Sequence, residues 1–332
     1  MADYRGLLVI GEIQNGVITR ITKELLSIGR KLADQLSEQL SIILLGSNLS
    51  EVARQGIIFG ADNVYVAENP LLNDYQSDAY TFIVAKVCQQ MSPSVVLLGQ
   101  TDAGRDLAPR LAARLKGSLS MGCTELKLDP ETHFLLQTRP MYGGNVNAVM
   151  IARCKPQIAT IRPRSIRPAE PVDFRKGEII PIEGKIDNFP TKYKVINRVR
   201  EEVEGVKLED AKVVVAGGRG QGKEGFELIR QLAKLLKGAI GASRPPCDEG
   251  WVPSSLQIGQ TGKVISPELY IAVGISGAMQ HIVSCLSSKR IVAINRDPDA
   301  PIFKVSDLGI VGDYREVLPP LIEKCKELLS DV

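Results

Sequence analysis

The residues best suited to hold a ligand lie in loops that follow apolar segments in the second half of the sequence. The loop GGRGQGKEG follows the segment AKVVVA, and its Gly220, Gly222 and Gly225 satisfy the spacing GxGxxG. Taken alone, this spacing predicts a dinucleotide pyrophosphate at the N-terminus of the next helix. The acidic residue that would hold a ribose about 20 positions later is missing, because Ser243 and Arg244 stand there. A standard NAD site is therefore disfavoured, while a tight glycine turn without a ligand stays open.

A second loop, residues 258–263 (IGQTGK), is rich in hydrogen-bond donors. It is not a P-loop, because Gln257 stands where a Walker A motif needs glycine and Val264 where it needs Ser or Thr.

The third loop follows the apolar segment LYIAVGI and begins at Ser276. We expect Ser276 to cap a helix and the next backbone N–H groups to point outward as an anion cradle. His281 would lie just inside that helix, near its positive end. Since the chain has two histidines, its place is suggestive, but a surface imidazole without a ligand is an equal alternative.

The bulk composition excludes several classes of protein. The 332-residue chain has a net charge of +3, which lacks the strong basic field of a nucleic-acid-binding protein. Its six cysteines follow neither a CxxC nor a Cys/His spacing, which argues against a zinc site, an iron-sulfur cluster or a disulfide framework. The first residues lack the features of a signal peptide, and no apolar run approaches the roughly 20 residues of a membrane span. We expect a cytoplasmic protein with no metal and no membrane span.

Short apolar runs alternate with amphipathic segments, which predicts an α/β fold with two α/β domains. In the first half, strands are expected at 7–13, 41–46, 63–68 and 94–100, and shorter alternating strands beyond residue 120. The second half shows the same alternation of apolar runs and amphipathic segments, with strands expected at AKVVVAGG, AIGAS, LYIAVGIS and RIVAIN. It predicts a doubly wound parallel sheet whose loops gather at one carboxyl edge, where such sheets bind ligands.

The expected domains are residues 1–194 and residues 195–332. The stretch from about 163 to 194 is rich in Pro and in charge of both signs, so we expect it to be the connection between them. Its basic run, Arg162, Arg164 and Arg167, is expected to be a solvated face, with a partner-docking patch as the alternative.

Several spaced segments of the second half resemble the alpha subunits of electron-transfer flavoproteins. They are GGRG, GASR, GWVPSSLQIGQTGKVISPELYIAVGISGAMQH and IVAINRDPDAPIFKVSDLGIVGD, in family order over residues 205–332. The first half resembles the family more loosely, through GQTDAGRDLAPRLAARL and RPMYGGN. The resemblance implies a C-terminal FAD-binding domain, an N-terminal domain that contacts a beta subunit, and electron transfer without a catalytic residue of the chain's own.

The resemblance also implies roles for individual residues. Arg219, Ser243 and Arg244 match positions that hold FAD, Arg244 near the flavin ring. The segment Ile258, Gly259, Gln260, Thr261 and Gly262 matches one in which the Gln and Thr bond the isoalloxazine edge around N5 and O4. Ser276, Gly277, Ala278, Met279, Gln280 and His281 match a pyrophosphate cradle that brings the His near the flavin N1 and O2 edge, where it would donate a hydrogen bond. Asn295, Asp313 and Tyr314 match positions contacting phosphate, ribose or adenine.

The stretches ITKELLSIGRKLAD, RPMYGGN and PQIATIRP resemble the anaerobic, NADH-linked branch that bifurcates electrons. That branch implies single-electron exchange with a partner dehydrogenase such as acyl-CoA dehydrogenase, in fatty acid beta-oxidation. A second FAD in the beta subunit would take hydride from NADH and reduce ferredoxin or flavodoxin. The alternatives are a non-bifurcating carrier to a quinone reductase, an NAD-dependent dehydrogenase suggested by the GxGxxG spacing, and a cofactor-free scaffold.

Overall fold

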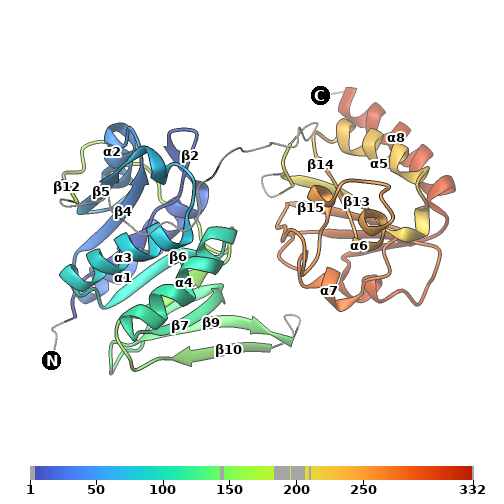
Figure 1. The fold of residues 1–332 in the computed structure, drawn as a ribbon. Coiled ribbons are helices and arrows are strands. Elements are labelled where there is room, and N and C mark those ends of the chain that lie inside the picture. Colours follow the sequence, from blue (N-terminus) through green and yellow to red (C-terminus); the bar gives the residue numbers. More distant parts are fainter. Residues whose placement is uncertain (1–3, 143–145, 183–194, 196–205, 209–210, 331–332) are drawn as a thin grey trace. The chain divides into compact units, whose positions relative to one another are not determined.

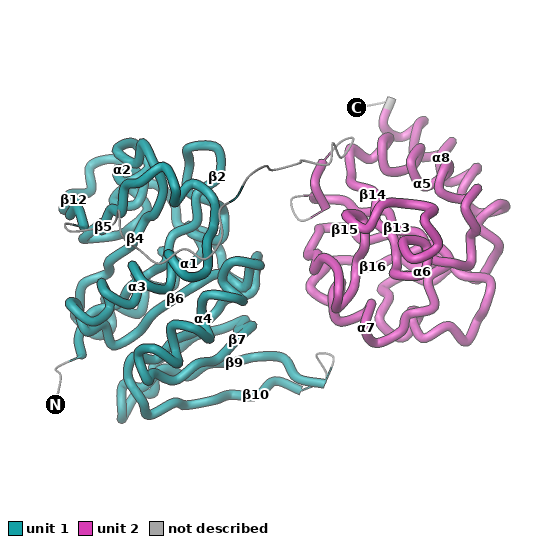
Figure 2. The backbone as a smooth tube through the Cα atoms, in the orientation of Figure 1, with its two compact units in different colours: residues 1–198 teal, residues 199–332 magenta. Residues whose placement is uncertain are grey.

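The protein consists of two compact units, described here from a computed structural model (Figures 1 and 2). It describes residues 4–142, 146–182, 195, 206–208 and 211–330. The chain divides between residues 198 and 199, where the sequence predicted 194 and 195. Each unit has its own parallel sheet, which confirms the α/β fold class.

Unit 1 is built on a seven-stranded sheet in the order β12-β5-β4-β1-β6-β11-β7, in which every neighbouring pair is parallel. The four strands expected near the start of the chain are all present. The strands are β1 (Leu7–Ile10), β4 (Leu40–Gly46), β5 (Asn63–Glu68), β6 (Val95–Gly99), β7 (Ser118–Cys123), β11 (Gln157–Ile161) and β12 (Glu178–Pro181).

Helices cover both faces of this sheet, because its strands are apolar on both sides. Leu7 and Val9 of β1 pack into one buried cluster, and Leu8 and Ile10 into another. The first cluster includes side chains of α1 (Arg20–Leu36) and α2 (Ser50–Ile58). The second includes side chains of α3 (Ser77–Met91) and α4 (Asp102–Leu115). Two separately buried faces are typical of a parallel sheet with crossover helices.

A smaller antiparallel sheet extends unit 1, in the order β10-β9-β8. Its strands are β8 (Glu125–Leu128), β9 (Leu135–Met141) and β10 (Val146–Ile151). A two-stranded hairpin, β2 (Ile13–Gln14) with β3 (Val17–Ile18), precedes α1. Strand β10 lies at the edge of its sheet and exposes apolar side chains.

The structure corrects the expected connection at residues 163–194. The described part of this stretch belongs to unit 1, because β12 pairs in parallel with β5. Before that strand, the amide of Val172 donates to the carbonyl of Ile58 at 3.0 Å, and Arg175 pairs with Asp62 at 3.2 Å. The prolines broke the periodicity that would have marked this stretch as part of a domain, and residues 183–194 lie outside the described part of the chain.

Unit 2 is a five-stranded parallel sheet in the order β14-β13-β15-β16-β17. Its strands are β13 (Val213–Gly217), β14 (Ala239–Ala242), β15 (Leu269–Val273), β16 (Ile291–Asn295) and β17 (Leu308–Val311). The order reverses beside β13, so the chain runs outward in both directions from this strand. Ligands of doubly wound sheets bind at the carboxyl edge of that reversal.

The two faces of the second sheet are covered differently. Helices α5 (Gly225–Leu235) and α8 (Tyr314–Ser330) share one buried cluster with the sheet, through Ile229 and Leu318 among others. On the other face, loops and the short helix α7 (Met279–Ile282) approach the sheet. A second short helix, α6 (Arg244–Asp248), follows β14 and packs through Cys247 against a cluster that includes Phe226 of α5. Ile258 and Ile282 anchor these loops in the core. Loops rather than long helices therefore frame the edge where a ligand would bind.

Candidate functional site

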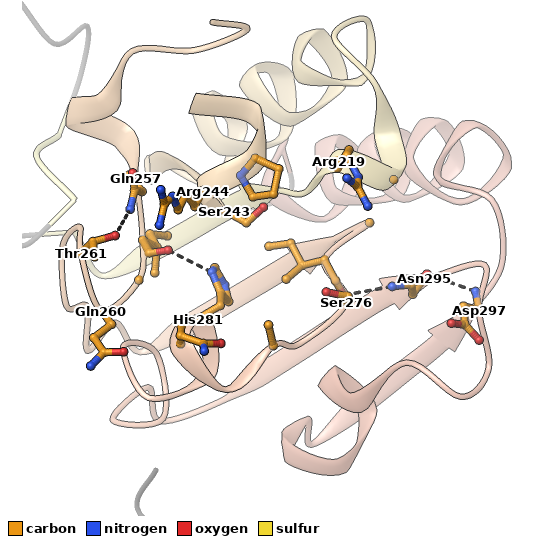
Figure 3. A pocket seen from close by; sticks show the side chains of 18 of the residues that line it. Arg219, Ser243, Arg244, Gln257, Gln260, Thr261, Ser276, His281, Asn295 and Asp297 are labelled. Carbon is orange, nitrogen blue, oxygen red and sulfur yellow. Dashed lines mark hydrogen bonds between the residues drawn. The ribbon is translucent and has the colours of Figure 1, made fainter. Parts of the chain in front are cut away.

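A cleft of about 730 Å³ runs along the carboxyl edge of the second sheet (Figure 3). Its lining comes from the segments that follow four adjacent strands and from the loop at 257–261. The lining residues are Arg219, Gly220, Ser243, Arg244, Pro245, Gln257, Ile258, Gly259, Gln260, Thr261, Gly274, Ile275, Ser276, Ala278, Gln280, His281, Asn295, Arg296 and Asp297. A cleft of this size, with mixed polar and apolar walls, matches a small-molecule or cofactor site.

Most of the residues predicted from the sequence lie together at this cleft. A smaller adjacent cavity of about 20 Å³ brings in Asp313 and Tyr314, and it shares Asn295 and Arg296 with the cleft. Gly262, Gly277 and Met279 are not among the residues that line either cavity.

The glycine-rich loop after β13 forms one wall of the cleft, but not through its GxGxxG spacing. A Cβ on Gly218 would lie 2.1 Å from the carbonyl oxygen of Gly274, so the loops after β13 and β15 pass each other at backbone distance. Gly220 lines the cleft, whereas Gly222 and Gly225 do not. Helix α5 begins at Gly225, beyond a 3₁₀ turn at Arg219–Gln221. A dinucleotide pyrophosphate at the start of α5, as the NAD-dehydrogenase reading requires, is therefore not favoured.

The loop after β15 differs from the prediction that Ser276 caps a helix. Helix α7 begins at Met279, and Ala278 is its N-cap residue. The cause is Gly277, whose φ of +85° turns the chain away from the helical path and lets it pass Ile302, whose backbone N would lie 2.2 Å from an added Cβ. Among the described residues that line the cleft, the backbone N–H groups of Ser276, Ala278 and Gln280 make no hydrogen bond to a backbone acceptor outside α7.

The loop at 257–263 is held in shape by its own hydrogen bonds. The side-chain nitrogen Nε2 of Gln257 donates to Oγ1 of Thr261 at 2.8 Å, and the amide of Gly262 donates to the carbonyl of Gly259 at 3.0 Å. The loop is tied to α7, because the amide of Gln260 donates to the carbonyl of Gln280 at 2.8 Å. Gly262 contributes to this folding, since a Cβ there would lie 2.4 Å from the carbonyl oxygen of Gln257.

His281 is buried, with 6% of its surface exposed, so the alternative of a surface imidazole is wrong. Its Nδ1 lies 3.0 Å from the carbonyl oxygen of Ile258, and its Nε2 lies 2.7 Å from the hydroxyl of the fully buried Tyr270. Burial lowers the pKa of His281 to about 4, although the Ile258 carbonyl acts in the opposite direction. Both ring nitrogens thus lie within hydrogen-bond distance of protein atoms, and His281 also lines the cleft.

Arginine side chains give the cleft a positive character. Arg219, Arg244 and Arg296 line it, and Arg244 is paired with Asp248 at 3.0 Å across a largely exposed surface. Exposed ion pairs of this kind are weak, so the guanidinium remains available to an anionic or electron-rich ligand. The arginines and the backbone amides of the loop after β15 together suit phosphate groups.

Asn295 stabilises the edge of the sheet from inside the cleft. Its Nδ2 donates to the carbonyl of Ile275 at 2.9 Å, and its Oδ1 accepts from the amide of Asp297 at 3.1 Å (Figure 3). The side chain thereby joins the ends of β15 and β16, which keeps the two loops at a fixed spacing.

Sequence reasoning missed part of the lining. These residues are Pro245, Gln257, Gly274, Ile275, Arg296 and Asp297. Most of them follow directly after a strand or after a predicted site residue, so their position at the carboxyl edge was a usable signal. In the described part of the chain, no group of three or more His, Cys, Asp or Glu side chains could hold a metal ion. Nor does any helix described there combine the length and apolar character needed to cross a bilayer.

Comparison with known proteins assigns both units. Residues 7–185 match the family profile described as "Electron transfer flavoprotein domain", and residues 207–286 match "Electron transfer flavoprotein FAD-binding domain". The chain is 43% identical to the electron transfer flavoprotein subunit alpha of Thermoanaerobacterium thermosaccharolyticum, over 99% of this chain and 100% of that protein. It is 41% identical to the corresponding subunit of Bacillus subtilis, over 97% and 98%. It is 36% identical to the "Acryloyl-CoA reductase electron transfer subunit beta" of Anaerotignum propionicum, over 98% and 96%.

Proposed function

Because this chain belongs to the electron-transfer flavoprotein alpha-subunit family, whose cofactor is FAD, we propose that the cleft of unit 2 holds that FAD and that the chain shuttles single electrons. The family works as a heterodimer with a beta subunit and with electron-transfer partners. FAD supplies the one-electron chemistry when bound. The residues of this chain bind it, orient it and exclude water around it.

The observation that carries this proposal is the match between the cleft and an extended cofactor with two chemically different ends. Arg244, Gln260 and Thr261 stand at one end, where an isoalloxazine would find a cation and polar side chains. The backbone amides of the loop after β15 and Arg219 supply donors for the pyrophosphate. Asp313 and Tyr314 stand at the adjoining cavity, which suits a ribose and adenine. Ser243, Ile258, Gly259 and Asn295 complete the walls between them.

For the electron route, we propose an acyl-CoA dehydrogenase or a similar dehydrogenase as partner, within a cytoplasmic, NADH-linked, electron-bifurcating system. The similarity to a subunit named for an acryloyl-CoA reductase favours a partner acting on acyl-CoA substrates. The stretches RPMYGGN and PQIATIRP support the bifurcating branch. Six free cysteines suit a reducing compartment.

Unit 1 is proposed to provide the contact with the beta subunit, through strand β10. Val146, Val149 and Ile151 on this edge strand are exposed, and exposed apolar side chains gathered on one element are typical of protein interfaces. Arginine belongs to the same interface composition. Arg139 on the neighbouring β9 has a buried Nε without a partner in the described structure. Burial, and then the charge of Arg139, lowers the pKa of Arg162, so an acidic group on the beta subunit would be favoured here.

The function is tested by producing the chain together with its beta subunit and counting flavin per heterodimer. We expect one FAD per heterodimer to be bound by the cleft of unit 2. Disrupting the cleft should remove this FAD and leave any flavin that the beta subunit binds. Reduction of ferredoxin or flavodoxin by NADH, observed only when an acyl-CoA substrate and its dehydrogenase are present, tests bifurcation. A heterodimer whose unit 2 stays without flavin after FAD is added would rule the proposal out.

The contact through β10 is tested with Val149→Asp, because Val149 is 60% exposed and the new carboxylate would be buried against the beta subunit. The matched control is Val17→Asp in β3, at a position 48% exposed on the separate hairpin. We expect the first variant to weaken heterodimer formation at least tenfold, as measured by sedimentation, and the control to leave it unchanged. Equal effects of the two variants would exclude β10 as the contact.

A further inference from the structure

We propose that Arg296 binds the phosphate on the adenosine side of the cofactor and thereby selects the dinucleotide FAD over the mononucleotide FMN. This role rests on the proposed FAD site. Arg296 lines the cleft and also the adjacent cavity of about 20 Å³, whereas Arg219 and Arg244 line the cleft alone. Of the described charged residues that line these two cavities, Arg296 is the one that they share.

The neighbours of Arg296 in the chain locate it along the cleft. Figure 3 shows Gln260 and Thr261 at one end of the cleft and Asn295 and Asp297 at the other. Arg296 stands between Asn295 and Asp297 in the sequence, so its backbone lies at the end away from Gln260 and Thr261. A cofactor with its flavin at those two residues and its adenosine at the smaller cavity would have its pyrophosphate beside Arg296.

The backbone around Arg296 is held by three hydrogen bonds of Asn295, the last residue of β16. Its Nδ2 donates to the carbonyl of Ile275 at 2.9 Å, which ties it to the loop after β15. Its Oδ1 accepts from the amide of Asp297 at 3.1 Å, which closes a turn around Arg296. Its carbonyl accepts from the amide of Gly312 at 3.0 Å. The backbone of Arg296 is therefore fixed between two neighbouring loops, while its side chain is exposed.

The positive charge of Arg296 is not neutralised within the described part of the chain, where its guanidinium forms neither a hydrogen bond nor an ion pair. Two acidic residues, Asp297 and Asp313, also line these cavities. Their carboxylates accept backbone amides instead, that of Asp299 at 3.0 Å and that of Arg315 at 2.9 Å. Because these carboxylates would repel a phosphate, an unpaired arginine in the same space is needed to offset them.

The chemistry of the two flavin nucleotides explains why this position gives selectivity. A guanidinium binds a phosphate through two parallel charge-assisted hydrogen bonds. FMN ends in the phosphate on the flavin side, which FAD also has, and FAD alone carries the second phosphate next to adenosine. We assign the shared phosphate to Arg219, which lines the cleft only, and the second phosphate to Arg296. Arg296 then strengthens the binding of FAD and leaves that of FMN unchanged.

The first test compares Arg296→Gln with Arg219→Gln in the flavin-depleted heterodimer, by fluorescence titration with FAD and with FMN. We expect Arg296→Gln to weaken FAD binding about tenfold and FMN binding less than about twofold. Arg219→Gln should weaken the binding of both nucleotides about equally. The beta subunit is the same in every sample, so its own flavin site contributes equally. A ratio of FAD to FMN affinity that stays unchanged in Arg296→Gln would overturn the proposal.

The second test needs FAD alone and changes the charge at position 296 in steps. Arg296→Lys should keep the FAD affinity within about threefold, Arg296→Gln should lower it about tenfold, and Arg296→Glu should lower it about tenfold further. The differences should shrink in high salt, because the side chain is exposed. The control is Arg230→Gln in α5, at a side chain that is 49% exposed and does not line the cleft. An FAD affinity that does not follow the charge at position 296 would contradict the proposal.

These measurements separate the role of Arg296 from the proposed function. If the unaltered heterodimer binds no FAD in the cleft of unit 2, the proposed function itself fails. If FAD binds there and Arg296→Gln binds it as tightly as the unaltered protein, the FAD site stands and the role of Arg296 is refuted. A urea titration should show equal stability of unit 2 in both proteins, which distinguishes weakened phosphate binding from a disturbed fold.

Discussion

Gln257 and Thr261 close the loop between them with a single hydrogen bond, from Nε2 to Oγ1 at 2.8 Å. Both residues line the cleft. Thr261 was expected from the family resemblance to contact the flavin, whereas Gln257 was not. The bond shows that the hydroxyl of Thr261 is already engaged as an acceptor, which leaves its O–H free to donate toward the cleft. Gln257 therefore helps to set the direction in which the hydroxyl of Thr261 donates.

Replacing Thr261 by Val should weaken FAD binding. The change removes both the acceptor of Gln257 and the donor to the cleft, at nearly constant volume, so we expect about a fivefold to tenfold lower affinity. Fluorescence titration of the flavin-depleted heterodimer measures it. Thr124→Val in unit 1 is the matched control and should leave the affinity unchanged. An unaltered affinity in Thr261→Val would mean that the loop bond does not matter for the site.

Replacing Gly277 by Ala should destabilise unit 2. A Cβ there would lie 2.2 Å from the backbone N of Ile302, which cannot move aside as a flexible side chain could, and φ is +85°. We expect a loss of at least about 3 kcal/mol in the free energy of unfolding, measured by urea titration. Gly250→Ala is the control, because its φ is +69° and nothing lies within 4 Å of the added Cβ. That variant should cost only about 1 kcal/mol, and similar losses at both positions would dismiss the steric argument.

Gly277 also illustrates what the sequence could and could not predict. Apolar runs located the strands of both sheets, since buried parallel strands need continuous Val, Ile and Leu. The start of α7 was predicted wrongly, because Ser276 has the side chain of a helix cap. The backbone of Ile302, 25 residues further along the chain, forces a turn at Gly277 instead. Contacts between segments so far apart leave no local pattern.

In the site, too, local sequence patterns located some residues, whereas contacts between distant segments could not be predicted. Positions after strands, such as Ser243 and Asn295, could be located because parallel strands end at one edge. The partners of His281 could not, since Tyr270 and Ile258 approach it from two other segments. The burial of His281 and its two contacts therefore became visible only in the folded protein.

Replacing Arg244 by Gln should weaken FAD binding without a measurable loss of stability. The side chain of Arg244 is 66% exposed, and its bond to Asp248 lies at the surface, where an ion pair contributes little to stability. A cation beside the electron-rich flavin edge should contribute more, so we expect roughly tenfold weaker binding, and less difference in high salt. Arg290→Gln provides the comparison, since Arg290 is 72% exposed, pairs with Asp307 at 2.8 Å and does not line the cleft. If both variants bind FAD equally well, Arg244 has no role in the site.

Asp62 joins three parts of unit 1, and its removal should loosen the stretch that the sequence assigned to a connection. Its carboxylate pairs with Arg30 at 2.7 Å and Arg175 at 3.2 Å, and it accepts the amide of Leu40 at 2.9 Å. Burial alone would raise the pKa of Asp62, but the Leu40 amide and the two arginines outweigh it, so the pKa is lowered. A carboxyl whose pKa is lower in the folded than in the unfolded protein stabilises the folded state at pH values above its unfolded pKa of about 4. This contribution is lost as the pH falls through the lower pKa of the folded protein.

Asp62→Asn should therefore destabilise unit 1 by about 2 kcal/mol at pH 7, because two charged hydrogen bonds are weakened. The difference from the unaltered protein should begin to shrink below about pH 4, where the carboxyl of the unfolded chain takes up a proton, and vanish only below the lowered pKa of the native carboxyl. Urea titrations at pH 7 and pH 3.5 measure it, and Asp173→Asn, at an exposed position of the same unit, is the control. Proteolysis at neutral pH should also cut the stretch around Arg175 faster in Asp62→Asn than in the control. A constant difference across the pH range would show that the charge of Asp62 does not hold this stretch against the sheet.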